Sequence, residues 1–192
     1  MRRGILGGTF DPPHVAHLVA AEAAYRQLGL DVVTFIPAGA PWQKADRVVS
    51  EARHRWAMTQ RAVAGVSYFE ADDREVNRRG WTYTIDTLAS YPGDEELVLI
   101  LGADAAHGFG TWHRAAGIVQ RAEIGVAPRP GIDRDQVNEA LEGARLSWLE
   151  GPELAISGTE LRDMVRRGLS VRFLVPDLVW SYIEDNGLYG RR

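Results

Sequence analysis

The stretch that decides the fold is residues 4–17, which read Gly4-Ile5-Leu6-Gly7-Gly8-Thr9-Phe10-Asp11-Pro12-Pro13-His14-Val15-Ala16-His17. A short apolar run leads into two glycines, and a proline pair then precedes an amphipathic pattern. This order predicts a strand, a tight turn and a helix in succession. Glycines let the backbone approach a ligand closely, and the N–H groups of a helix start favour an anion. We therefore expect an anion site between this strand and this helix.

The same alternation continues along the chain. Apolar runs predict strands at Gly4–Leu6, Val32–Ile36, Val66–Ala71, Leu97–Leu101, Ile124–Ala127 and Leu146–Leu149. Amphipathic runs predict helices at His14–Leu28, Glu51–Ala64, Thr84–Tyr91, Ala103–Phe109, Arg114–Arg121, Arg134–Gly143, Thr159–Arg167 and Leu178–Asn186. Strands that alternate with helices are typical of βαβ units. The expected fold is α/β: a Rossmann-like, doubly wound parallel sheet flanked by helices, whose ligands sit beyond the carboxyl ends of the strands.

Length and composition limit the class of protein. The 192 residues correspond to about one domain, so we expect a single domain over 1–192, with a C-terminal helical part at about 156–192. Hydrophobic residues make up 45% and charged residues 25%, as in soluble globular proteins. The absence of cysteine excludes disulfides, thiolate zinc sites and cysteine nucleophiles. A homo-oligomer is compatible with these numbers.

Charge and hydropathy point away from nucleic acid and membrane. The net charge of −4 argues against a general nucleic-acid binder, which needs a basic face. The apolar runs Gly4–Gly8 and Leu97–Ala103 are too short for a secretory signal or a membrane span. The sequence predicts a cytoplasmic protein.

Two histidines stand at the start of the first predicted helix. His14 and His17 are three residues apart and therefore share one helix face. They could simply cap or decorate the helix, and no third ligand lies nearby for zinc. Behind a strand and two glycines, however, they line an oxyanion or phosphate site. The chain contains neither G-x-G-x-x-G nor G-x-x-x-x-G-K-[ST].

A second candidate anion site lies at Ile156-Ser157-Gly158-Thr159-Glu160-Leu161-Arg162. Ser157 and Glu160 form a capping box, which explains both residues without any function. The N–H groups of a helix start, with Arg162 one turn further on, would nevertheless bind an anion.

Both segments resemble the signatures of the nucleotidyltransferase superfamily: the glycine turn with its H-x-x-H pair, and I-S-x-T-x-x-R. Ala16 stands where many members carry glycine, and Gly158 falls at a variable position. The resemblance implies that His14, His17 and Arg162 are catalytic through charge stabilisation. It also implies that the ATP phosphates are bound by Gly7, Gly8, Thr9, Phe10, Ser157, Thr159 and Arg162.

Segments in the middle of the chain are candidates for binding the acceptor, the molecule that receives the transferred group. Four short segments stand at predicted helix starts or after predicted strands: Trp81-Thr82-Tyr83-Thr84, Gly102-Ala103-Asp104, Thr111-Trp112-His113 and Arg129-Pro130-Gly131. From the residues alone, Thr84 is an N-cap, and Trp112 is either core filler or a platform for an aromatic ring.

The order of these segments, from Gly7 to Tyr189, resembles the bacterial nicotinate-nucleotide adenylyltransferase family. Pantetheine-phosphate adenylyltransferases are a looser match, because they are shorter and lack the T-Y-T and T-W segments. The resemblance implies acceptor-binding residues Thr82, Tyr83, Trp112, Lys44, Gly102, Asp104 and Arg129. Lys44 is carried over alone from its loop, because Gln43 replaces a histidine found in many members.

The implied reaction joins ATP and nicotinate mononucleotide, giving nicotinate adenine dinucleotide and pyrophosphate in NAD biosynthesis. Mg²⁺ would bridge the triphosphate oxygens, and the sequence contains no metal-ligand motif. Free N–H groups at residues 82–84 would form a donor-only pocket that prefers a carboxylate to an amide. Two alternatives stay open: another adenylyltransferase, with nicotinamide mononucleotide or phosphopantetheine as acceptor, or a non-catalytic nucleotide-binding module.

Overall fold

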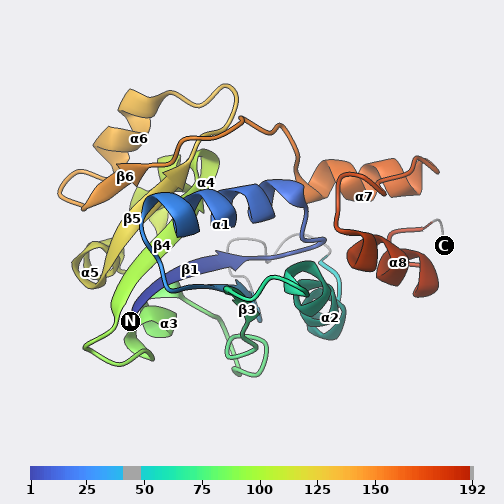
Figure 1. The fold of residues 1–192 in the computed structure, drawn as a ribbon, viewed down its shortest axis with the longest axis horizontal. Coiled ribbons are helices and arrows are strands. Elements are labelled where there is room, and N and C mark those ends of the chain that lie inside the picture. Colours follow the sequence, from blue (N-terminus) through green and yellow to red (C-terminus); the bar gives the residue numbers. More distant parts are fainter. Residues whose placement is uncertain (41–48, 191–192) are drawn as a thin grey trace.

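The computed structural model describes residues 1–40 and 49–190, and its centre is a six-stranded sheet in the order β3-β2-β1-β4-β5-β6 (Figure 1). The strands are β1 (Arg2–Gly8), β2 (Val32–Pro37), β3 (Phe69–Ala71), β4 (Glu96–Gly102), β5 (Ala122–Ala127) and β6 (Leu146–Trp148). All neighbouring pairs are parallel. The chain order reverses between β1 and β4, which is where doubly wound sheets bind their ligands. The expected fold class is confirmed.

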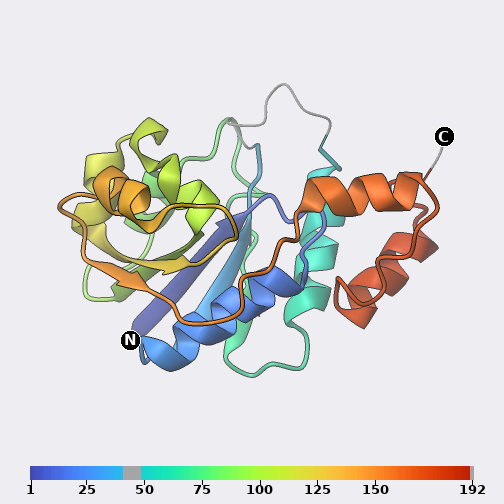
Figure 2. The same cartoon turned by 90° about the horizontal axis from the view of Figure 1, so that it is seen from above.

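Helices cover both faces of this sheet (Figures 1 and 2). They are α1 (Val15–Gln27), α2 (Ala52–Val63), α3 (Thr84–Ala89), α4 (Ala103–His107), α5 (Ala115–Arg121), α6 (Arg134–Ala140), α7 (Gly158–Arg166) and α8 (Asp177–Asp185), with a 3₁₀ turn η2 at Phe109–Thr111. The predicted strands and helices all occur. Two boundaries shift by three residues: α6 ends at Ala140 and not at Gly143, and β3 begins at Phe69 and not at Val66. The residues before β3 are held in turns, with Phe69 N–H bonded to Val66 O at 3.1 Å.

The apolar residues of β4 explain why both faces are covered. Leu97, Leu99 and Leu101 pack into one core with α3, α4 and α5, whereas Val98 and Ile100 pack into a second core with α1. Successive side chains of a strand point to opposite faces, so a continuous apolar run needs helices on both.

A third core joins the C-terminal part to the rest of the molecule. Met58 and Ala62 of α2 pack with Leu161 of α7 and with Val179 and Ile183 of α8. Figures 1 and 2 both show α7 and α8 beside α2, at one end of the sheet.

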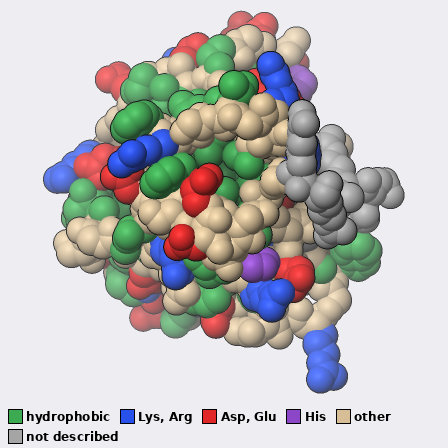
Figure 3. Space-filling view, turned by 90° about the vertical axis from the view of Figure 1, so that its right-hand side faces the viewer, with side chains coloured by type: hydrophobic (Ala, Val, Ile, Leu, Met, Phe, Trp, Pro, Cys, Tyr) green, Lys and Arg blue, Asp and Glu red, His purple; other side chains and the backbone are tan. Residues whose placement is uncertain are grey.

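The face on the side of α7 and α8 carries hydrophobic, acidic and basic side chains interspersed with one another (Figure 3). Among the described residues on this face there is no continuous basic patch. No helix within residues 1–40 and 49–190 is long and apolar enough to cross a membrane.

Candidate active site

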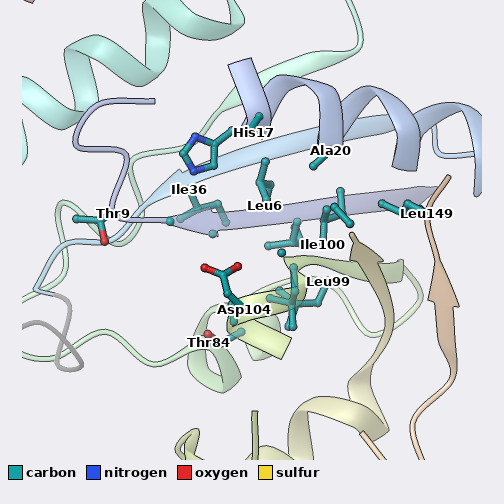
Figure 4. Close-up of a pocket in the computed structure, with 18 of the residues that line it drawn as sticks. Leu6, Thr9, His17, Ala20, Ile36, Thr84, Leu99, Ile100, Asp104 and Leu149 are labelled. Carbon is teal, nitrogen blue, oxygen red and sulfur yellow. The ribbon is translucent and has the colours of Figure 1, made fainter. Parts of the chain in front are cut away.

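A cavity of about 420 Å³ opens at the carboxyl edge of the sheet, around the ends of β1 and β4. Eleven of the predicted site residues line it: Gly7, Gly8, Thr9, His14, His17, Thr82, Tyr83, Gly102, Asp104, Trp112 and Arg129. Figure 4 shows Thr9, His17 and Asp104 gathered near the end of β1, with Leu6, Leu99 and Ile100 along the strands. The structure therefore brings together residues from five separate segments of the sequence.

The second motif lies next to this cavity. Ser157, Thr159 and Arg129 line an adjoining depression of about 350 Å³, and Arg129 also lines the main cavity. The Arg129 guanidinium donates to Ile156 O at 2.7 Å and lies 3.5 Å from Asp104 Oδ2. One arginine thus connects the start of α4, the segment after β5 and the residues just before α7. Lys44 lies outside the described residues.

His14 and His17 form a stacked pair at the start of α1. His14 is the N-cap residue, and its backbone N–H donates to His17 Nδ1 at 3.1 Å. The two ring centroids are 3.8 Å apart. Because Nδ1 of His17 accepts a hydrogen bond, we assign the proton of its neutral ring to Nε2. His17 lines the cavity, so Nε2–H is the group suited to donate to a phosphate oxygen.

The His14 ring is only 3% exposed, and its Nδ1 is buried without a hydrogen-bond partner. Burial, helped by the positive charge of Arg129, lowers the pKa of His14 to about 4. His14 is therefore neutral at pH 7. The C-terminal part covers the start of α1, with Val15 N–H donating to Leu174 O at 3.0 Å.

The turn between β1 and α1 presents backbone to the cavity and buries its aromatic ring. Phe10 has a φ of 49°, and its 1% exposed side chain packs against Phe35 and edge-on against His17. The Phe10 side chain points into the core, so its backbone is the part that can face a phosphate, and phosphate binding by Phe10 stays a prediction. A Cβ on Gly8 would meet the Phe10 ring at 3.0 Å, whereas a Cβ on Gly7 would meet nothing within 4 Å.

The start of α7 is capped as the sequence predicts. Ser157 Oγ accepts from Glu160 N–H at 3.3 Å, and Glu160 Oε2 accepts from Ser157 N–H at 3.1 Å. Arg162, one turn on, is not a solvated surface charge: its side chain is 16% exposed and donates to Asp11 O at 2.7 Å. Its Nε is buried without a partner. The two signature motifs therefore touch each other directly.

Another part of the cavity wall is formed by aromatic residues and threonines. Tyr83, not Thr84, is the N-cap of α3, so that prediction was one residue late. Tyr83 lies against His113, with ring centroids 4.2 Å apart. Trp112 packs on Phe109 and also lines the cavity, so it is both core filler and exposed ring surface.

Glu75 is a cavity residue that the sequence did not reveal. Its largely buried carboxylate accepts from Thr87 Oγ1 at 2.6 Å, and burial raises its pKa. It lines the same end of the cavity as Thr82, whose N–H donates to Ala40 O at 3.4 Å. The expected donor-only pocket is thus corrected, because an acceptor group lies in it. In the sequence, Glu75 falls in the charged run Asp72-Asp73-Arg74-Glu75, which is typical of a solvated surface.

Arg55 was also missed, although it fixes the walls of the site. This buried arginine donates to Thr9 O at 3.1 Å, to Gly39 O at 2.9 Å, to Ser50 O at 3.0 Å and to Ala38 O. Thr9 follows β1, and Ala38 and Gly39 follow β2. One guanidinium thus holds the ends of two neighbouring strands together. Among the arginines within residues 1–40 and 49–190, Arg55 is the one whose side chain is buried, and no local sequence pattern distinguishes it from the others.

No cluster of three or more histidine or acidic side chains suited to a metal ion occurs in the part of the chain that the structure describes. The polar groups of the cavity are instead imidazoles, a guanidinium, backbone N–H groups and single carboxylates. Such a set can bind an anionic, phosphate-bearing ligand and stabilise added negative charge.

Comparison with known proteins agrees with this site. The profile of the cytidylyltransferase-like family matches residues 5–164, a range that includes both signature motifs. Proteins named probable nicotinate-nucleotide adenylyltransferase match over nearly the whole chain. The one from Dehalococcoides mccartyi is 40% identical over 100% of this chain and 98% of its own, and the one from Saccharopolyspora erythraea is 44% identical over 98% and 89%. The chain belongs to the nicotinate-nucleotide adenylyltransferase family.

Solved structures agree in fold. Plasmodium falciparum nicotinic acid mononucleotide adenylyltransferase, described as complexed with NaAD, superposes with a TM-score of 0.82 at 18% identity, over 98% of this chain and 97% of that one. The same enzyme described as complexed with APC gives a TM-score of 0.80. At this identity the likeness concerns the fold.

Proposed function

We propose that this protein transfers the adenylyl group of ATP to nicotinate mononucleotide, giving nicotinate adenine dinucleotide and pyrophosphate. The observation that carries the proposal is the cavity at the β1/β4 switch point, where the glycine turn, the stacked histidines and Arg129 meet an aromatic acceptor end. Membership of the nicotinate-nucleotide adenylyltransferase family supports the same acceptor.

The reaction needs no covalent enzyme intermediate. A 5′-phosphate oxygen of the mononucleotide attacks the α-phosphorus in line, and the bond from that phosphorus to the pyrophosphate oxygen breaks. The protein then has to position two phosphates and stabilise the developing charge. We assign charge stabilisation to His17 Nε2–H, to Arg129 and to the backbone N–H groups of Gly7 and Gly8.

We assign His14 and Arg162 roles in the reaction that differ from those the sequence suggested. His14 is neutral and buried, so it donates a hydrogen bond rather than supplying a charge. Arg162 holds the turn at Asp11, where its Nη1 donates to the backbone oxygen and lies 3.8 Å from Oδ2. We assign it to the phosphate end through this turn. Ser157 and Thr159 lie beside Arg129 and complete the phosphate end.

Trp112, Tyr83 and Thr82 form the acceptor end, with Asp104 and Gly102 between the two nucleotides. Ring stacking on Trp112 suits a pyridine. Mg²⁺ enters as part of the ATP substrate, where it neutralises triphosphate oxygens and keeps several waters. A cytoplasmic location, the absence of nucleic-acid partners and a homo-oligomer stay predictions.

An acceptor panel tests the proposal. Pyrophosphate release is measured with ATP and, in turn, nicotinate mononucleotide, nicotinamide mononucleotide and phosphopantetheine. We expect kcat/KM for nicotinate mononucleotide to exceed that for the amide at least about tenfold, because the chain belongs to the nicotinate-nucleotide adenylyltransferase family. Preference for another acceptor would reassign the substrate, and no turnover with any acceptor would indicate a binding module.

A further inference from the structure

The last described residues of the chain reach back to the turn that follows β1. The Tyr189 hydroxyl donates a hydrogen bond to Asp11 Oδ1 at 2.7 Å. Asp11 is 4% exposed, and its second oxygen accepts from Ser50 N–H at 3.1 Å. Asp11 is not among the residues that line the cavity. Its carboxylate is therefore used inside the protein and does not face a ligand.

The direction of this hydrogen bond is fixed by the surroundings of Tyr189. Burial, followed by the negative charge of Asp11, raises the pKa of Tyr189 well above its usual value. The phenol therefore stays protonated, and its hydroxyl is the donor. A hydrogen bond from a buried hydroxyl to a carboxylate is among the stronger kinds in proteins.

The same turn meets the C-terminal part at further points. Arg162 Nη1 donates to Asp11 O, and a Cβ on Gly158 would lie 2.9 Å from that carbonyl oxygen, so α7 begins in direct contact with the turn. Three residues beyond Asp11 lies His14, whose backbone N–H holds the His17 ring. The position of both histidines thus depends on where Asp11 is held.

We propose that Tyr189 is a positioning residue for the phosphate-binding turn and that it acts through Asp11. The inference rests on the proposed function, since the turn is assigned there to the ATP phosphates. Fixing Asp11 aligns the backbone N–H groups of the turn and the His14–His17 pair with the triphosphate. The tail of the chain therefore completes the ATP site without touching the nucleotide.

The competing explanation is that Tyr189 merely fastens the C-terminal part to the molecule. A second tyrosine provides the matched control. The Tyr182 hydroxyl lies 3.0 Å from His54 Nδ1 of α2, so it fastens the same part of the chain to α2 and not to Asp11. Tyr182→Phe and Tyr189→Phe each remove one hydroxyl that joins the C-terminal part to the body.

The experiment measures the affinity of both variants for a non-hydrolysable ATP analogue with Mg²⁺ by calorimetry, beside kcat and KM for each substrate. Both variants should lower the melting temperature by a similar, small amount. Only Tyr189→Phe should weaken analogue binding, and lower kcat/KM for ATP, by about tenfold. The KM of the acceptor should change less than about twofold, because its end of the cavity does not rest on Asp11.

Action through Asp11 is tested by adding Asp11→Asn. The amide keeps the shape but removes the charge, and neutral hydrogen bonds have about half the strength of charge-assisted ones. In that background Tyr189→Phe should therefore cost only about threefold in analogue affinity. The proposal is overturned by an unchanged affinity in Tyr189→Phe, by an equal loss in Tyr182→Phe, or by a loss that stays tenfold beside Asp11→Asn.

Failure of the proposed function would look different. A parent protein that binds the ATP analogue but releases no pyrophosphate with any acceptor refutes the adenylyl transfer. Analogue affinity needs no turnover, so the comparison of Tyr189→Phe with Tyr182→Phe decides on Tyr189 in either case.

Discussion

His14 makes the stability of the protein depend on pH. Its pKa is about 4 in the folded protein, whereas a histidine in an unfolded chain has a pKa of 6.5. Between these values the unfolded chain binds more protons, so stability is fully present above pH 6.5 and is lost as the pH falls toward 4. We expect the free energy of unfolding to fall by about 3 kcal/mol over this window from His14 alone.

Urea unfolding at pH 7, 5.5 and 4 measures this loss. His14→Asn should show a shallower decline than the parent, because its side chain does not titrate. His107→Asn, at an exposed position on α4, is the control for loss of a histidine as such. Equal slopes for His14→Asn and the parent would contradict the buried, neutral histidine.

The roles of the two ring nitrogens of His17 can be tested separately. Asparagine can place an acceptor near the Nδ1 position and keep the bond from His14 N–H, whereas glutamine reaches the Nε2 position. If Nε2–H stabilises the transferring phosphoryl group, His17→Asn should lower kcat by roughly 10²–10³-fold and His17→Gln by clearly less. The melting temperature of His17→Asn should stay near that of the parent. Turnover of His17→Asn within a few-fold of the parent would remove His17 from the mechanism.

Helix α7 brings the second motif onto the first, and Arg162 is the side chain that joins them. Its guanidinium contacts Asp11 O and, at 3.4 Å, Thr159 Oγ1, which a lysine cannot do at once. Arg162→Lys should therefore lower kcat/KM for ATP by about tenfold or more. The matched control is Arg167→Lys, at the end of the same helix, where an exposed pair with Asp163 contributes little. Steady-state kinetics that do not separate the two variants would make Arg162 an ordinary structural residue.

The C-terminal part is expected to unfold together with the rest of the molecule. Its third core is built on Met58 and Ala62 of α2, so α7 and α8 have no separate apolar interior among the described residues. We therefore predict one domain and a single cooperative transition, with equal calorimetric and van't Hoff enthalpies. Scanning calorimetry checks this, with and without ATP and Mg²⁺, whose binding should move the whole transition upward. A separate low-temperature transition would indicate two domains.

The order of strands and helices could be read from the chain because it depends on local patterns. Three local patterns each involve only a few residues: the apolar runs of the strands, the glycine turn and the Ser157–Glu160 capping box. Each of them is found in the structure. The position of the site followed as well, since parallel strands end at one edge of a sheet. Two short motifs were enough to indicate phosphate chemistry.

What only the tertiary structure decided is the burial of charged and polar side chains by distant segments. Glu75 and Arg55 look like surface charges in the sequence, yet both are buried. Tyr189 hydrogen-bonds to Asp11, although the two residues lie near opposite ends of the sequence. His14 likewise stays neutral because burial beside the C-terminal part and the charge of Arg129 lower its pKa. Desolvation and long-range contact depend on how elements pack and not on which residues are neighbours in the chain, so no local pattern reports them.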